Sequence, residues 1–109
     1  MMTNVWGPPG WVFLHCITMG YPYKINIKNK QHLSLKKHTK DFFNILGHVL
    51  PCKYCRESYL EYISQNPIDK HLNTRKELVK WFYDIHNKVN QKLGVPKCDI
   101  PSFTEFYQK

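Results

Sequence analysis

The chain has 109 residues, a length that fits one domain with one modest hydrophobic core. Hydrophobic residues make up 42% and aromatic residues 15% of the sequence, which excludes a disordered chain. No apolar run is long enough for a membrane span, and no basic segment precedes the apolar residues 11–14, so no secretory signal is expected. The formal net charge is +8 and comes mainly from lysine. Lysine favours solubility or loose attraction over sequence-specific reading of nucleic acid.

Four helices and a short fifth are predicted, with no convincing strand, which indicates an all-α four-helix bundle in a single domain over residues 1–109. The first helix is expected over residues 9–20, because proline is tolerated in an opening turn and Gly20 can end the helix. A Lys- and Asn-rich loop follows over residues 21–30. The second helix is expected over residues 31–50 and the third over residues 52–65, with Pro51 between them. The apolar residues at helical spacing in the second helix are Leu35, Phe42, Phe43, Leu46 and Val49.

The strongest helix signal begins at Thr74, which forms a capping box with Glu77. Apolar residues then recur every three or four positions until Gly94 and Pro96 end the helix. A second capping box at residues 102–105 predicts the short fifth helix. The recurring apolar residues of the fourth helix are Leu78, Phe82, Ile85, Val89 and Leu93.

Cys52 and Cys55 form the first candidate site, because two cysteines three positions apart can close a redox disulfide or supply half of a zinc site. In the first turn of the third helix, the free N–H groups and the helix dipole favour a Cys52 thiolate, and Lys53 and Arg56 add positive charge. Cys55 is expected to be the more buried partner, an arrangement that suits thiol–disulfide exchange. The zinc alternative needs two further ligands, such as Cys98 and a histidine. Redox chemistry is favoured because no second closely spaced pair exists.

A polar arc lies beside the apolar stripe of the fourth helix, at about 100° per residue. It is either a solvated face or a wall for a flat polar ligand, and the residues alone leave both interpretations open. On the first helix, Trp11 and His15 share a face, and the residues alone favour core packing over ligand binding. The Lys-rich residues 24–40 are interpreted as a solvated surface. The arc consists of Tyr83, His86, Asn87 and Asn90.

Together these segments resemble the FAD-linked sulfhydryl oxidases, the family of augmenter of liver regeneration and its yeast and viral relatives. The resemblance covers residues 6–96 and lies in three motifs in the family's order: WGxxxWxxLH from Trp6, CxxC from Cys52 and HNxVNxKLG from His86. It implies a helical bundle that binds one FAD, usually as a homodimer, with Cys52 and Cys55 as the catalytic pair. The residues implied to bind the flavin are Trp6, Gly7, Pro8, Trp11, His15, Ser58, Tyr83, His86, Asn87, Val89, Asn90, Lys92, Leu93 and Tyr107.

The resemblance also implies the reaction and its partners. A protein dithiol or a thioredoxin-like thiol carrier would reduce the Cys52–Cys55 disulfide, and the electrons would pass through FAD to O2, giving H2O2. Tyr83 stands where many relatives have a structural cysteine, so that disulfide is expected to be missing. No nucleic acid and no membrane are expected as partners. Since no targeting signal is visible, the expected location is intracellular, in the host cytoplasm or the virion if the chain is viral. A zinc-stabilised helical binding module is the alternative.

Overall fold

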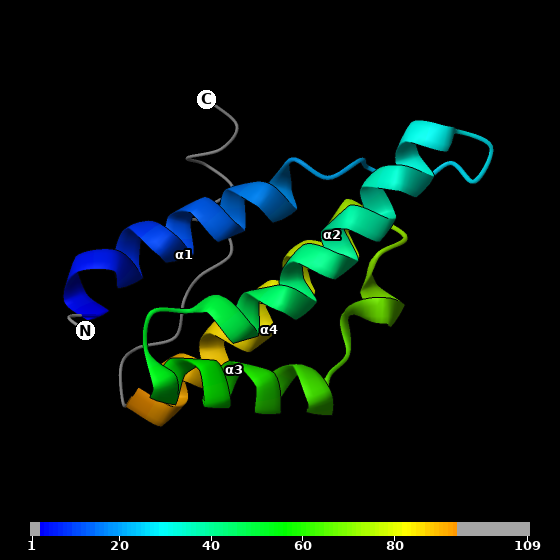
Figure 1. The fold of residues 1–109 in the computed structure, drawn as a ribbon. Coiled ribbons are helices and arrows are strands. Elements are labelled where there is room, and N and C mark those ends of the chain that lie inside the picture. Colours follow the sequence, from blue (N-terminus) through cyan, green and yellow to red (C-terminus); the bar gives the residue numbers. More distant parts are fainter. Residues whose placement is uncertain (1–2, 94–109) are drawn as a thin grey trace.

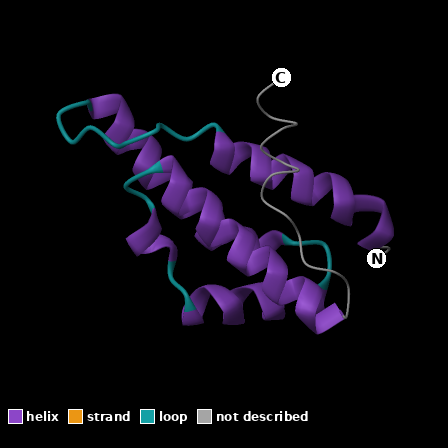
Figure 2. Cartoon of the chain, turned by 180° about the vertical axis from the view of Figure 1, so that it is seen from behind, coloured by secondary structure: helices purple, strands orange, loops and turns teal. Residues whose placement is uncertain are grey.

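The computed structural model describes residues 3–93, which form a bundle of four α-helices and one short 3-10 helix (Figure 1). The predicted all-α fold is confirmed. Within the described part of the chain, extended pairing is limited to one isolated bridge between Lys24 and Thr74 (Figure 2). No helix of that part is both long and apolar enough to cross a bilayer. The elements are α1 (Thr3–Met19), α2 (Lys30–Val49), α3 (Lys53–Gln65), η1 (Ile68–His71) and α4 (Arg75–Leu93).

The core lies around α4, which packs against α1, α3 and η1. Phe43 from α2 reaches this core, with its ring centroid 5.3 Å from that of Phe82 and 5.7 Å from that of Trp81. All three side chains are buried, and each such burial stabilises the fold by about 1.5–3 kcal/mol. The indole N–H of Trp81 donates to the carbonyl oxygen of Asn66 at 2.7 Å, so its polar atom is satisfied.

The helix ends follow the local signals of the sequence. The N–H of Glu77 donates to the hydroxyl of Thr74 at 3.1 Å, and that hydroxyl donates to the Glu77 carboxylate at 3.0 Å, which confirms the predicted cap of α4. The Asn29 side chain caps α2 by accepting from the N–H groups of Gln31 and His32. Caps of this kind contribute about 1 kcal/mol each.

Two predicted helix starts need correction, and one short helix was missed. α1 begins at Thr3 instead of residue 9, with Pro8 and Pro9 inside the helix. Proline has a helical φ, so α1 continues through both residues, although each lacks the N–H that would bond to a carbonyl of the first turn. α3 begins at Lys53 instead of residue 52. The 3-10 helix η1 was not predicted, and the expected helix at residues 102–105 lies outside the described residues.

Candidate functional site

The cysteine pair lies where α3 begins. Cys52 is the N-cap of α3 with an extended backbone, and its sulfur accepts a hydrogen bond from the N–H of Cys55 at 3.2 Å. The side chain of Arg56 donates to the carbonyl oxygen of Leu50 at 2.6 Å, which ties the helix back to the preceding turn. Both cysteines are half-buried thiols without a disulfide. A sulfur thus occupies the position where a Ser or Asp oxygen usually caps a helix.

The two thiols differ in acidity, as the sequence predicted. Hydrogen bonds from the thiol and the N–H of Cys55 lower the pKa of Cys52. Burial raises the pKa of Cys55 to about 11, and its hydrogen bond to Cys52 acts in the same direction. The two groups therefore titrate as a coupled pair, with the first negative charge on Cys52 and the proton retained by Cys55. The largest cause of the lowered pKa of Cys52 is hydrogen bonding from Cys55. The sequence had instead suggested the helix dipole and the nearby cations as causes.

A second group of predicted residues meets between α1 and α4. The indole of Trp11 stacks on the imidazole of His86, with ring centroids 3.7 Å apart and planes 7° from parallel. The Nε2 atom of His15 lies 2.8 Å from the Nδ1 atom of His86. The ring centroid of His15 lies 4.3 Å from that of Tyr83. His15, Tyr83 and His86 are buried. Residues that are far apart in the sequence therefore form one aromatic and imidazole cluster.

Burial makes both imidazoles of this cluster neutral. It lowers the pKa of His86 to about 4, and burial together with the nearby His86 lowers the pKa of His15 to about 3. Two neutral imidazoles at hydrogen-bond distance need one N–H and one lone pair between them. The contact therefore fixes the tautomer of each ring relative to the other, and the cluster can offer an uncharged flat surface.

The last turn of α4 lies against α3. Lys92 donates to the hydroxyl of Ser58 at 3.2 Å, and its ammonium lies 4.7 Å from the ring centroid of Tyr54. Both predicted residues, Lys92 and Ser58, therefore lie close to each other on the cysteine-bearing side of the bundle. Tyr54 was missed by the sequence analysis, although its place inside the CxxC motif could have singled it out.

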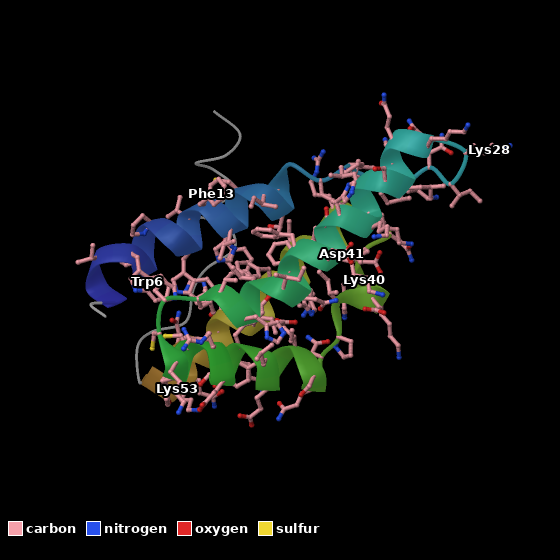
Figure 3. The ribbon with its side chains drawn as sticks, viewed as in Figure 1. Trp6, Phe13, Lys28, Lys40, Asp41 and Lys53 are labelled. Carbon is pink, nitrogen blue, oxygen red and sulfur yellow. The ribbon has the colours of Figure 1, made fainter. Side chains whose placement is uncertain are left out.

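Trp6, another of the residues predicted to bind the flavin, lies in the first turn of α1. Its Nε1 atom is buried and has no hydrogen-bond partner among the residues that the structure describes. Figure 3 shows Trp6 and Lys53 at the same end of the molecule, opposite Lys28. Gly7 and Pro8 follow Trp6 in α1. The other predicted contact residues of α4, Asn87, Val89 and Asn90, are half-buried.

These groups fit the requirements of a flavin dinucleotide. A flat aromatic ligand needs apolar and aromatic walls, which Trp11, His86 and Tyr83 supply, and its polar atoms need donors. The orphaned indole N–H of Trp6 is such a donor, and Lys92 offers a cation for phosphate oxygens. Which predicted residue touches which part of the ligand stays a prediction. The side chain of Leu93 and all of Tyr107 lie outside the described residues.

The zinc alternative finds no support in the structure. Among the residues that it describes, no three His, Cys, Asp or Glu side chains lie close enough together to hold a metal ion. Cys98, the proposed third ligand, lies outside that part of the chain. The sulfur of Cys52 instead accepts hydrogen bonds from the N–H and the thiol of Cys55.

Comparisons with known proteins point to one group. The family model of the Erv1/Alr family matches residues 8–108. The chain is 37% identical over 110 residues to the probable FAD-linked sulfhydryl oxidase R368 of Acanthamoeba polyphaga mimivirus, covering 100% of this chain and 73% of that protein. It is 34% identical over 93 residues to the mitochondrial FAD-linked sulfhydryl oxidase ERV1 of Saccharomyces cerevisiae, covering 85% of this chain but only 45% of the yeast protein.

Solved structures agree with the sequence matches. The crystal structure of the FAD binding domain of Erv1 from Saccharomyces cerevisiae is similar with a TM-score of 0.82 and 31% identity, over 98% of this chain and 94% of that chain. The yeast Erv1 core is similar with a TM-score of 0.82 and 30% identity, over 98% of this chain and 84% of that chain. The similarity therefore extends over nearly the whole of this chain, in sequence and in fold.

Proposed function

The chain belongs to the Erv1/Alr family, and from this premise we propose that it is an FAD-linked sulfhydryl oxidase with Cys52 and Cys55 as its redox-active pair. The observation that carries the assignment is the asymmetric pair of thiols at the start of α3, with a lowered pKa for Cys52 and a raised pKa for Cys55. Thiol–disulfide exchange needs a sulfur that leaves readily as a thiolate, and the lowered pKa makes Cys52 such a sulfur.

The reaction with the substrate is a pair of exchange steps. In the oxidised enzyme, a substrate thiolate attacks the sulfur of Cys52, the Cys52–Cys55 bond breaks, and Cys55 leaves with the electron pair and takes up a proton. The second substrate thiolate then attacks the substrate sulfur of the mixed disulfide, and Cys52 leaves as a thiolate. The substrate has gained a disulfide, and the enzyme holds the two free thiols seen in the structure. Hydrogen bonds from Cys55 stabilise the departing charge on Cys52.

The Cys52–Cys55 disulfide must then be re-formed, which requires the two thiols to give up two electrons. A bound FAD would accept this electron pair and pass it to O2, giving H2O2. The Trp11, His15 and His86 cluster would form the wall against which the flat part of the cofactor packs. The two neutral histidines add hydrogen-bonding atoms without adding charge. The indole N–H of Trp6 would find its missing partner on the same ligand.

Two cysteine substitutions test this function. Wild-type protein should be yellow and should consume O2 when dithiothreitol is added. Cys55→Ser should prevent reduction of the bound flavin by dithiothreitol, and Cys52→Ser should chiefly abolish disulfide transfer to the substrate, because Cys52 is the sulfur that substrate attacks. Cys16→Ser, which removes a cysteine of α1 outside the pair, serves as the control and should keep full activity. If both variants of the pair oxidise thiols as fast as wild type, the assignment is wrong.

We further propose that the substrate is a protein dithiol or a thioredoxin-like carrier. Support comes from the position of Cys52 at a helix N-cap, next to the exposed Pro51 and Tyr54, where another protein can approach. A dithiol is favoured over a single thiol because its second sulfur resolves the mixed disulfide without a new encounter. Reduced thioredoxin-like protein should therefore be oxidised faster than glutathione at equal thiol concentration, as measured by O2 consumption.

We also propose that the enzyme is a homodimer. Apolar side chains of α2 recur on one exposed face at intervals of three, four or seven positions, the spacing of a helix-packing seam. Ile45 is 58% and Val49 is 65% exposed, which is high for aliphatic residues of an isolated domain. A second copy of this chain presents the same faces and can cover them in a symmetric contact. The exposed apolar residues are Val5, Val12 and Phe13 of α1 and Leu33, Leu35, Phe42, Ile45 and Val49 of α2.

A further inference from the structure

The loop between α1 and α2 exposes two large apolar side chains. Tyr23 is 79% and Ile27 is 76% exposed, the highest fractions among the large hydrophobic residues of the described chain. Between them lies Ile25, which is buried. The alternation shows that the backbone of the loop turns Tyr23 and Ile27 outward while it turns Ile25 into the core.

Hydrogen bonds hold this loop in place. The N–H of Ile25 donates to the carbonyl oxygen of Asn73 at 2.8 Å, and the N–H of Arg75 donates to the carbonyl oxygen of Tyr23 at 3.2 Å. The hydroxyl of Tyr21 donates to the carbonyl oxygen of Leu72 at 2.7 Å. The loop is thus fastened to the segment before α4 on both sides of Tyr23. Its exposed apolar side chains are presented by a fixed backbone, which reduces the entropy that a binding partner would have to remove.

Positive charge surrounds the two exposed side chains. Residues 1–40 contain six lysines and no Asp or Glu, so they carry +6 of the net charge of +8. Lys24, Lys28 and Lys30 lie in this loop or at its junction with α2, and all three are exposed. Asp41 and Asp69 are each paired with another lysine of α2. The Glu77 carboxylate accepts a hydrogen bond from the hydroxyl of Thr74, the residue that bridges to Lys24. Figure 3 shows Lys28 at the end of the molecule opposite Trp6 and Lys53.

We propose that this loop is a peripheral binding site for anionic phospholipid membranes. Tyr23 and Ile27 enter the interface between headgroups and acyl chains, and the lysines bind the anionic headgroups. Tyrosine suits this place because its ring is apolar and its hydroxyl stays in contact with water. The sequence alone predicted a solvated surface and no membrane partner, because it did not show that two apolar side chains among the lysines point outward.

Other partners fit these observations less well. A protein interface needs a contiguous area of about 800 Å² per partner with an apolar centre, whereas the loop offers two side chains separated by lysines. Single-stranded nucleic acid would use stacking on Tyr23, but the aliphatic Ile27 has no π-face for a base. A lipid surface uses both side chains and all three lysines.

Co-sedimentation of the flavin-loaded protein with vesicles tests the proposal. The protein should bind vesicles of phosphatidylcholine mixed with phosphatidylserine and bind pure phosphatidylcholine much more weakly. Lys24→Gln combined with Lys28→Gln should weaken binding roughly 30-fold, about fivefold for each lost charge. Tyr23→Ser combined with Ile27→Ser should weaken it about tenfold or more, because their burial in the interface is lost. All variants should keep the wild-type rate of dithiothreitol oxidation, since the loop is remote from the cysteine pair.

The matched control is Lys80→Gln combined with Lys88→Gln, which removes the same charge from α4 and should leave vesicle binding unchanged. Equal weakening by both lysine pairs would show a diffuse charge effect and would overturn the proposal. So would full binding by the Tyr23→Ser and Ile27→Ser variant. Tighter binding to a single-stranded oligonucleotide than to anionic vesicles, with no effect of Ile27→Ser, would assign the loop to nucleic acid instead.

Discussion

At the scale of single residues, the site combines two kinds of titratable pair with opposite tasks. The Cys52 and Cys55 pair shares a proton unevenly, so that one sulfur becomes a good leaving group. The His15 and His86 pair is kept neutral by burial, so it can line a flat surface without repelling or attracting charge. Hydrogen bonding is the main cause of the lowered pKa of Cys52, whereas burial is the main cause of the raised pKa of Cys55 and of the lowered pKa of both histidines. The same bundle thus lowers one thiol pKa and two imidazole pKa values by different physical causes.

The neutral histidines predict a loss of stability in mild acid. Both folded pKa values, about 3 and about 4, lie below the ordinary value of 6.5, so the unfolded chain takes up protons that the folded chain does not. The free energy of unfolding should therefore be highest above pH 6.5 and fall as the pH decreases toward 4, by up to about 1.4 kcal/mol per pH unit for each histidine. Urea unfolding at pH 7 and pH 5 measures this fall, and His86→Gln should reduce the slope. Equal stability at both pH values would contradict the buried neutral pair.

Sequence reasoning found most of this site because its residues stand in motifs with a physical meaning. The contacts of Trp11 and His15 with His86 could not be predicted locally, since they depend on how α1 packs on α4. The hydrogen bond from Lys92 to Ser58 could not be predicted either, because it depends on how α4 packs on α3. Residue types and their helix faces were predictable, whereas partners across helices depend on tertiary packing.

At the scale of elements, α2 and α3 approach each other closely at Gly47. A Cβ atom on this residue of α2 would lie 2.6 Å from Cδ2 of Leu60 and 2.8 Å from Cδ1 of Tyr59, both on α3. Tyr59 is buried, and its hydroxyl donates to the carbonyl oxygen of Phe43 at 2.6 Å, so its ring has little freedom to move. The absence of a side chain at Gly47 thus sets the distance between α2 and α3, and with it the position of the cysteine pair at the start of α3.

Gly47→Ala should therefore destabilise the protein by about 1–3 kcal/mol through overpacking, reduced by up to about 1 kcal/mol of helix propensity. Gly10→Ala is the matched control, because its Cβ would meet only Trp6, at an ordinary 3.7 Å. That control should leave stability unchanged or raise it by up to about 1 kcal/mol. Denaturant unfolding measures both. A stable Gly47→Ala protein would mean that α2 and α3 can separate at low cost.

The helices themselves were predictable to different degrees. The capping box at Thr74 and the apolar period after it located α4 closely, because both signals are local. The predicted beginning of α1 was wrong: proline normally costs a hydrogen bond and a steric clash in a helix interior, so Pro8 and Pro9 indicated an opening turn, whereas α1 runs through both residues. In α2, apolar spacing could not separate Phe43, which is buried, from Phe42 and Val49, which are exposed. That difference depends on which helices are present on each side.

At the scale of the whole molecule, the exposed apolar faces of α1 and α2 predict a dimer. A charged residue introduced into these faces should dissociate it. Ile45→Lys should convert the dimer into a monomer, because a buried unpaired ammonium costs far more than the apolar contact contributes. The side chain is exposed in the single chain, so the variant should fold with an unchanged helical circular dichroism spectrum. Glu61→Lys on the exposed face of α3 is the control and should remain dimeric. Sedimentation equilibrium decides the matter, and identical masses for wild type and Ile45→Lys would exclude this face.

Bound FAD should stabilise the fold as a whole. A ligand that binds only the folded chain stabilises it by about 2.7 kcal/mol at a free concentration of 100 times its Kd. For a domain of this size, that corresponds to a rise in Tm of roughly 10–20 °C. His86→Ala removes the imidazole that stacks on Trp11, so it should reduce the rise on adding FAD. Thr74→Ala removes the α4 cap and should lower the Tm with and without FAD by the same amount, leaving the rise intact. Calorimetry of wild type, His86→Ala and Thr74→Ala, each flavin-free and FAD-loaded, gives the three FAD-dependent differences in Tm. An equal FAD-dependent rise in wild type and His86→Ala would place the flavin away from the cluster between α1 and α4.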